Sequence, residues 1–296
     1  MRPAACLMLA LLLLGGCSDE TRPPDDGPPP LGSVSVITKD SEIRLPLDYF
    51  SPHPRDADDI VRAEEYRARE CMRGFGLTYP IRPQKQASYP GVVHPGLFGL
   101  IDPGLVKHGY GPVLAPDGWD EPTTPVQSRP PSAVEDAVWT GKLTEYEGDK
   151  VPQGGCLAEG RRKLGGTADL YWPKNELQAE AVKLAEKDPR TADVTRSWSA
   201  CMKDAGYAYA SPGDAASDAR WLVPGPPSPA EVSAAAADVG CKTQVNYAGM
   251  RTAILTAYER RLVRLHKARL TTHKLELTKR LRHAEELISR VDVDAL

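Results

Sequence analysis

Residues 69–79 read Arg-Glu-Cys-Met-Arg-Gly-Phe-Gly-Leu-Thr-Tyr, and residues 199–209 read Ser-Ala-Cys-Met-Lys-Asp-Ala-Gly-Tyr-Ala-Tyr. The two stretches share Cys-Met, the basic residue after it, and Gly and Tyr at the same offsets. Apolar residues precede each cysteine at helical spacing, and glycine is the common residue after the last helical turn. Two unrelated helix ends that are similar by chance would explain the pattern equally simply. We interpret it as two tandem units, each built on a helix that ends soon after its cysteine.

Four cysteines of the exported chain are expected to form disulfides. The sequence has six, of which Cys6 lies in the leader and Cys17 at its end. An even number of the remainder in an exported protein favours disulfides over free thiols. Zinc is the weaker alternative, because the spacings include no Cys-x-x-Cys pair and no histidine at ligand spacing. Since Gly-Cys segments at 155–156 and 240–241 complete the two units, we predict, among three connectivities, the pairs Cys71 with Cys156 and Cys201 with Cys241.

The N-terminus carries an export signal. Arg2 precedes an apolar stretch at residues 4–14, which is too short to span a bilayer as a stable helix. The following Leu-Gly-Gly-Cys at residues 14–17 resembles the bacterial lipobox, in which a diacylglycerol is attached to the cysteine before cleavage. The resemblance implies that residues 1–16 are a signal peptide and that Cys17 is the lipidated, palmitate-bearing N-terminus at the extracytoplasmic face of the cell membrane. An ordinary secretory signal cleaved nearby is the alternative.

Composition indicates a soluble body on a tether. The 296 residues carry a net charge of -3 and are 41% hydrophobic. Only one run, near the N-terminus, is continuously apolar, which excludes a multi-span membrane protein, and the near-neutral charge gives no field for generic nucleic-acid binding. The 28 prolines indicate many turns and irregular segments. We predict that residues 17–55 form the lipidated cysteine and a Pro-rich tether, because the run up to Pro30 holds almost no apolar side chains.

A family resemblance rests on the cysteine motifs. Residues 198–207, read with the Ala-Asp-Val-Gly-Cys segment at 237–241, resemble a pattern found in uncharacterised actinobacterial lipoproteins, and the Gly-Tyr element at Tyr110 is similar to one in that group. The similarity extends over roughly residues 60–265. It implies envelope localisation and a mostly helical body, and it carries no reaction, ligand or catalytic residue to this chain.

The fold class expected from the pattern is mainly α, a disulfide-pinned helical domain with a long Pro/Gly-rich loop and a long C-terminal helix. The first unit should cover residues 56–170 and the second residues 171–296. Residues 80–131 hold 11 Pro and 7 Gly and form the long loop. Its aromatic side chains either make a recognition surface or pack the loop onto the helical body, and packing is the ordinary outcome.

Three helix starts are marked by capping residues. Ser132 and Ser228 each precede a glutamate by three residues, the spacing of a capping box, and Asp188 precedes Pro189 at a first helical position.

The C-terminal region is predicted to be a long basic helix, because no Gly or Pro occurs from Met250 to the end. Between Glu259 and His283 it has nine Arg or Lys against two Glu. This helix is a candidate surface for anionic lipid or an anionic wall polymer, or for self-association through its leucines. A solvated helix whose leucines pack on the body is the ordinary alternative. The candidate contact residues are Arg260, Arg261, Arg264, Lys267, Arg269, Lys274, Lys279 and Arg280.

No catalytic or metal-binding motif is found. The sequence lacks Gly-x-Ser-x-Gly, His-Glu-x-x-His, a phosphate loop and Cys-x-x-Cys. We therefore expect no catalytic residue, no metal and no cofactor, and a non-catalytic binding or scaffolding protein anchored in the envelope. The alternatives are an accessory subunit of a transporter or sensor, and an envelope hydrolase with an unrecognised site. A deep pocket with converging acids and histidine would favour the enzyme.

Overall fold

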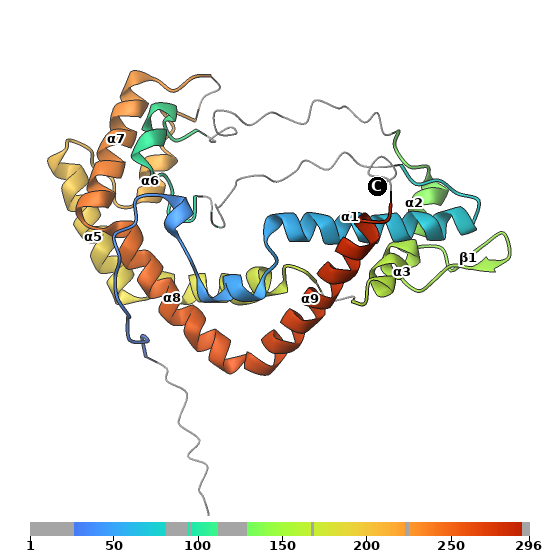
Figure 1. Ribbon diagram of the computed structural model, residues 1–296. Coiled ribbons are helices and arrows are strands. Elements are labelled where there is room, and N and C mark those ends of the chain that lie inside the picture. Colours follow the sequence, from blue (N-terminus) through green and yellow to red (C-terminus); the bar gives the residue numbers. More distant parts are fainter. Residues whose placement is uncertain are drawn as a thin grey trace, which may run out of the picture.

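The structure is a computed structural model in which residues 27–80, 94, 96–111, 129–166, 169–222 and 225–291 are described. They form two helical lobes that are joined by the bent pair of helices α8 and α9 (Figure 1). The sheet content of these ranges is one short hairpin, β1 (Glu145–Tyr146) and β2 (Asp149–Lys150), whose strands pair antiparallel. The predicted mainly α class is confirmed.

The first lobe packs three helices of the first sequence unit: α1 (Pro54–Gly74), α2 (Ala133–Thr140) and α3 (Gly155–Lys163). Most of the apolar stripe of α1 is fully buried, where the helix packs against α3 and, in the same lobe, against α9. Gly160 allows this close packing, because a side chain there would collide with the α1 backbone at Glu64. The core of this lobe includes Ile60, Ala68, Met72, Val138 and Trp139.

The second lobe is built around Trp198, which is fully buried. The helices around it are α4 (Ala179–Glu186), α5 (Pro189–Asp204), α7 (Pro229–Gln244) and α8 (Tyr247–Leu265). The short helix α6 (Pro212–Ala216) and a π-helical turn, η4 (Pro173–Gln178), complete the helical part.

Both disulfides have the predicted connectivity. Cys71 and Cys156 join α1 to α3, with their Cα atoms 5.5 Å apart. Cys201 and Cys241 join α5 to α7, with a Cα separation of 5.6 Å. Each bond therefore closes one of the two sequence units.

The C-terminal region is two helices instead of one. α8 ends at Leu265 and α9 (Lys267–Ile288) begins after His266, where the backbone leaves helical geometry at φ -104° and ψ 19°. In Figure 1 the two helices are the arms of a V, one in each lobe. The reason lies in the leucines: Leu255 and Leu262 are buried in the second lobe, whereas Leu277 is buried against α1.

The predicted tether is too long, because residues after Pro30 belong to the fold. Residues 31–50 include the 3₁₀ turns η1 (Asp40–Glu42) and η2 (Pro46–Phe50) and pack against the second lobe. Part of their apolar side chains are buried, because η2 packs against α8, α9 and η4, whereas Val36 and Tyr49 are exposed. The buried residues are Ile37, Ile43, Leu45 and Leu47.

The two lobes also exchange elements between the predicted sequence units. The segment 96–111, which contains η3 (Pro103–His108), packs on α7, although it belongs to the first unit. α9 packs on α1, although it belongs to the second. The predicted boundary near residue 170 therefore does not separate the lobes.

The described part of the long loop packs on the body. Phe98 and Ile101 are buried in the core of the second lobe, and the Tyr110 ring stacks on Trp221 with the ring centroids 5.7 Å apart. Packing is therefore the role of these aromatics. Tyr89 and Trp119 of the same loop lie outside the described residues, as do the predicted signal peptide and Cys17.

Candidate functional site

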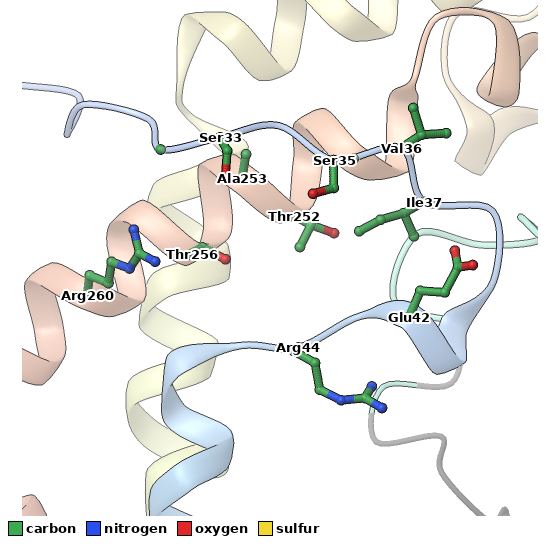
Figure 2. Close-up of a pocket in the computed structure, with 12 residues that line it drawn as sticks. Ser33, Ser35, Val36, Ile37, Glu42, Arg44, Thr252, Ala253, Thr256 and Arg260 are labelled. Atoms are coloured by element: carbon green, nitrogen blue, oxygen red, sulfur yellow. The ribbon is translucent and has the colours of Figure 1, made fainter.

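A cavity of about 410 Å³ lies between α8 and the irregular segment at residues 32–44. Residues 32–37 form one wall, residues 42 and 44 close the lower side, and α8 forms the other wall. Figure 2 shows Arg260 and Glu42 at opposite ends of this cavity, with hydroxyl side chains between them. The hydroxyl residues are Ser33, Ser35, Thr252 and Thr256.

The start of α8 determines where the wall segment lies. Asn246 adopts the left-handed conformation at φ 50° and ψ 46°, and its side-chain amide donates to the Ser35 carbonyl at 3.1 Å. Gly249 is buried one turn later, and a Cβ atom there would collide with the same carbonyl oxygen. A glycine is thus required at this close approach of segment and helix.

The polar groups of the cavity are incompletely paired. Within the described ranges, neither Arg44 nor Arg260 forms an ion pair, and Arg44 donates only to the carbonyls of Ser41 and Ile43, at 2.8 and 2.7 Å. Thr252 is 9% exposed, and its hydroxyl oxygen is buried with no hydrogen-bond partner among the described residues. Such a hydroxyl costs free energy unless something supplies the missing bond.

The cavity has one carboxylate, Glu42, against its two guanidinium groups. Glu42 Oε2 accepts from the backbone amides of Thr38 and Lys39, at 2.8 and 3.1 Å, which fixes the side chain at the end of the cavity. The cavity therefore has a cationic end at Arg260 and an acceptor at the other end. Its groups can bind and orient a polar ligand, and it contains no histidine or cysteine to act as base or nucleophile.

A second hollow, about 390 Å³, lies beside α9, close to the elbow that residues 264–267 form between α8 and α9. Its floor is Trp172, with the Arg269 guanidinium 3.9 Å from the ring centroid. Burial lowers the pKa of His273, which favours the neutral imidazole, and its Nε2 has no hydrogen-bond partner in the described part of the chain. Asp169 and Glu276 line the same hollow, but neither is hydrogen-bonded to His273 within the described residues. A base oriented by a carboxylate is therefore not formed here.

A buried cluster of ionisable groups lies on α7, outside the lining of the two cavities described above. Asp238 is fully buried and accepts from Lys242 at 2.9 Å and from the Trp198 indole at 2.9 Å. Burial raises the pKa of Asp238 and lowers the pKa of Lys242. Lys242 also donates to the Leu100 carbonyl at 2.8 Å, so this cluster fastens the segment 96–111 to α7. Sequence reasoning missed it, although an acid and a base four residues apart on an alanine-rich helix was the available signal.

The predicted basic surface is less extensive than the sequence suggests. The prediction that Arg280 is a surface residue is wrong, because its side chain is 2% exposed and forms a buried ion pair with Glu64 of α1. Arg269 pairs with Glu176 at 3.3 Å, and Lys274 lies over the Tyr49 ring. Arg261 donates to the Gly27 carbonyl at 2.5 Å. The exposed members of the predicted set are Arg260, Arg264, Lys267, Arg269 and Lys279.

Comparisons with known proteins do not assign the chain to a family. Neither a protein family, nor a curated protein, nor a solved structure matches the chain. In the described ranges no cluster of three or more His, Cys, Asp or Glu side chains is arranged for a metal ion, and no helix there has both the length and the hydropathy to cross a bilayer. The two disulfides indicate that the chain folds in an oxidising, extracytoplasmic environment.

Proposed function

We propose that the protein is a lipid-anchored component of the bacterial cell envelope that binds or scaffolds a partner outside the membrane and does not catalyse a reaction. The observation that carries the proposal is the pair of core disulfides in a chain whose leader ends in a lipobox-like Leu-Gly-Gly-Cys. Both features belong to the same compartment. Cys17 is the residue that would carry the diacylglycerol, and two acyl chains suffice for stable membrane residence.

The entry point of the chain supports this arrangement. The Gly27 carbonyl accepts from Arg261 on α8, so the described fold begins against the last turns of that helix. Gly27 is the tenth residue after Cys17, and an extended Pro-rich segment of that length reaches about 30 Å. The elbow that follows α8 presents the exposed cations Arg264 and Lys267 and the exposed Leu265. This elbow is the proposed contact with anionic lipid or wall polymer, and Leu265 the proposed point of self-association.

The anchor is tested by mass spectrometry of the N-terminal peptide from the membrane fraction, beside a Cys17→Ala chain. We expect a diacylated Cys17 as the first residue and release of the variant from the membrane. An intact peptide that runs through Cys17, or a variant that stays equally membrane-bound, would refute the anchor. The elbow is tested with Arg264→Gln/Lys267→Gln in phosphatidylglycerol vesicles of varied salt, with Leu265→Ser in sedimentation as the matched test of self-association.

A further inference from the structure

The cavity beside α8 carries an inference about the ligand class. Its three chemical features are two guanidinium groups without a carboxylate partner, a row of hydroxyls, and a buried Thr252 oxygen without a hydrogen-bond partner, all within the described residues. A cavity of about 410 Å³ falls within the size range of small-molecule sites. Guanidinium groups bind oxyanions, and phosphate above all, with several directed hydrogen bonds.

The distribution of charge decides which part of a ligand lies where. Arg260 lies at one end of the cavity and Arg44 at its lower side, whereas Glu42 lies at the other end (Figure 2). A carboxylate disfavours an anion beside it but accepts hydrogen bonds from hydroxyl groups. Glu42 uses Oε2 for two backbone amides, and Oε1 has no partner among the described residues. The ligand should therefore have an anionic group at one end and hydroxyl groups at the other.

We propose that this cavity binds a small phosphorylated polyol, with the phosphate at Arg260 and the hydroxyl groups toward Thr252 and Glu42. The inference rests on the proposed binding role but not on the anchor at Cys17. The ligand chemistry is shared by free polyol phosphates and by the headgroup of a glycerol phospholipid. The wall segment 32–37 directly follows the tether, so either source can reach the cavity.

The first test is calorimetric titration of the full chain in neutral detergent with glycerol 1-phosphate, with inorganic phosphate and with glycerol as separate probes. We expect glycerol 1-phosphate to bind at least about tenfold more tightly than either half of the molecule. Arg260→Gln should weaken this binding about tenfold or more, since a charge-assisted bond is lost. Arg282→Gln, which changes an exposed cation of α9 outside the cavity lining, is the control and should bind normally.

Thr252→Val separates a binding role from a structural one. Because the Thr252 hydroxyl has no partner in the unliganded protein, its removal should leave the thermal midpoint unchanged or higher while glycerol 1-phosphate binds several-fold more weakly. A lowered midpoint with unchanged affinity would overturn the assignment. So would absence of binding for all three probes, or inorganic phosphate that binds as tightly as glycerol 1-phosphate, and both results are independent of whether Cys17 is lipidated.

The source is distinguished by reconstituting the lipidated chain in phosphatidylcholine vesicles. If the headgroup is the ligand, phosphatidylglycerol should raise the apparent Kd for free glycerol 1-phosphate more than phosphatidylserine at equal surface charge, and Arg260→Gln should abolish the difference. If the free compound is the ligand, the two anionic lipids should act alike. Either result keeps the proposed ligand chemistry, whereas binding of glycerol 1-phosphate that is unaltered by Arg260→Gln in every vesicle would overturn it.

Discussion

The two lobes are fastened in parallel ways, because each has one disulfide and one buried ion pair among the described residues. The disulfides act within the sequence units, joining α1 to α3 and α5 to α7. The ion pairs act between them: Arg280 attaches α9 to Glu64 of the first lobe, and Lys242, paired with Asp238, attaches residues 96–111 to the second. Covalent bonds thus close each unit, and buried charges hold the element that each lobe receives from the other unit.

The ion pairs of the two lobes should differ in how well they tolerate the loss of one partner. A buried ion pair gains little net free energy, because desolvation offsets most of the attraction, but losing one partner leaves an uncompensated charge. Within the described residues Asp238 has no cationic partner besides Lys242. Glu64, in contrast, has Arg161 at 3.5 Å in addition to Arg280. The attachment of 96–111 should therefore tolerate substitution less well than the attachment of α9.

The largest expected effect is the loss of a disulfide. The sequence separations are 85 and 40 residues, for which chain entropy gives upper figures of about 4.5 and about 4 kcal/mol. We expect Cys71→Ala/Cys156→Ala to lower the free energy of unfolding by slightly more than Cys201→Ala/Cys241→Ala, measured by urea denaturation. Each variant should lose its own lobe first in hydrogen exchange. Equal loss of protection in both lobes from either variant would show that the lobes unfold as one unit and that this comparison is wrong.

The second effect distinguishes the two ion pairs. Lys242→Met leaves Asp238 buried without its cation and should cost about 3 kcal/mol or more. Arg280→Met should cost less, because Arg161 still faces Glu64. Denaturant midpoints measure the difference, and hydrogen exchange should report faster opening of residues 96–111 in the first variant and of α9 in the second.

The matched controls are the double variants Asp238→Asn/Lys242→Met and Glu64→Gln/Arg280→Met. Each removes both charges, so part of the stability lost in the single variant should return. A double variant less stable than its single variant would contradict the idea that the lone buried carboxylate causes the loss of stability in that lobe.

Local signals in the sequence were sufficient for several helix starts and for the covalent links. The Ser132 capping box is formed as predicted, with the Glu135 amide donating to the Ser132 hydroxyl at 3.2 Å, and the Asp188 cap accepts from the Arg190 amide at 2.9 Å. The repeated Cys-Met and Gly-Cys segments were enough for the disulfide connectivity. These features depend on residues a few positions apart, or on a repeat.

The exchange of elements could not be predicted, because it depends on contacts distant in sequence. In the sequence Arg280 looks like a solvated cation in a basic run. It is a core residue because it pairs with Glu64, which is 216 residues away in the sequence. The cavity was likewise hidden: Arg44 and Arg260 come from distant segments, and Gly249 has no pattern that reveals the Ser35 carbonyl against it. The sequence showed that the basic stretch is unusual, but it did not show which of its residues are exposed.

The third effect is a pH dependence in the first lobe. The hydrogen bonds from Arg129, followed by the Ser132 backbone amide, lower the pKa of Glu135 to about 2. A carboxylate with a depressed pKa contributes stability above its unfolded value near 4.5, and that contribution is lost as the pH falls toward 2. Glu135→Gln should therefore cost about 1 kcal/mol at pH 7, the scale of a helix cap, and progressively less between pH 4.5 and pH 3. Urea denaturation at each pH measures this, and a constant difference would contradict the charged capping role.

The smallest effect comes from the corresponding glutamate of the second lobe. Ser228 accepts from the Glu231 amide at 3.1 Å, as a capping residue should, but the Glu231 carboxylate does not complete the box. It accepts instead from the Tyr110 amide at 2.9 Å, and Gly109 has no side chain that would block this approach. Glu231→Ala should thus change global stability by less than about 1 kcal/mol while residues 109–111 open more readily, since local openings need not involve the whole fold. We expect faster hydrogen exchange of the Tyr110 amide, and Glu231→Gln should restore slow exchange because its amide oxygen still accepts. Unchanged exchange in Glu231→Ala would mean that Lys242 and the Tyr110 ring hold the segment without this bond.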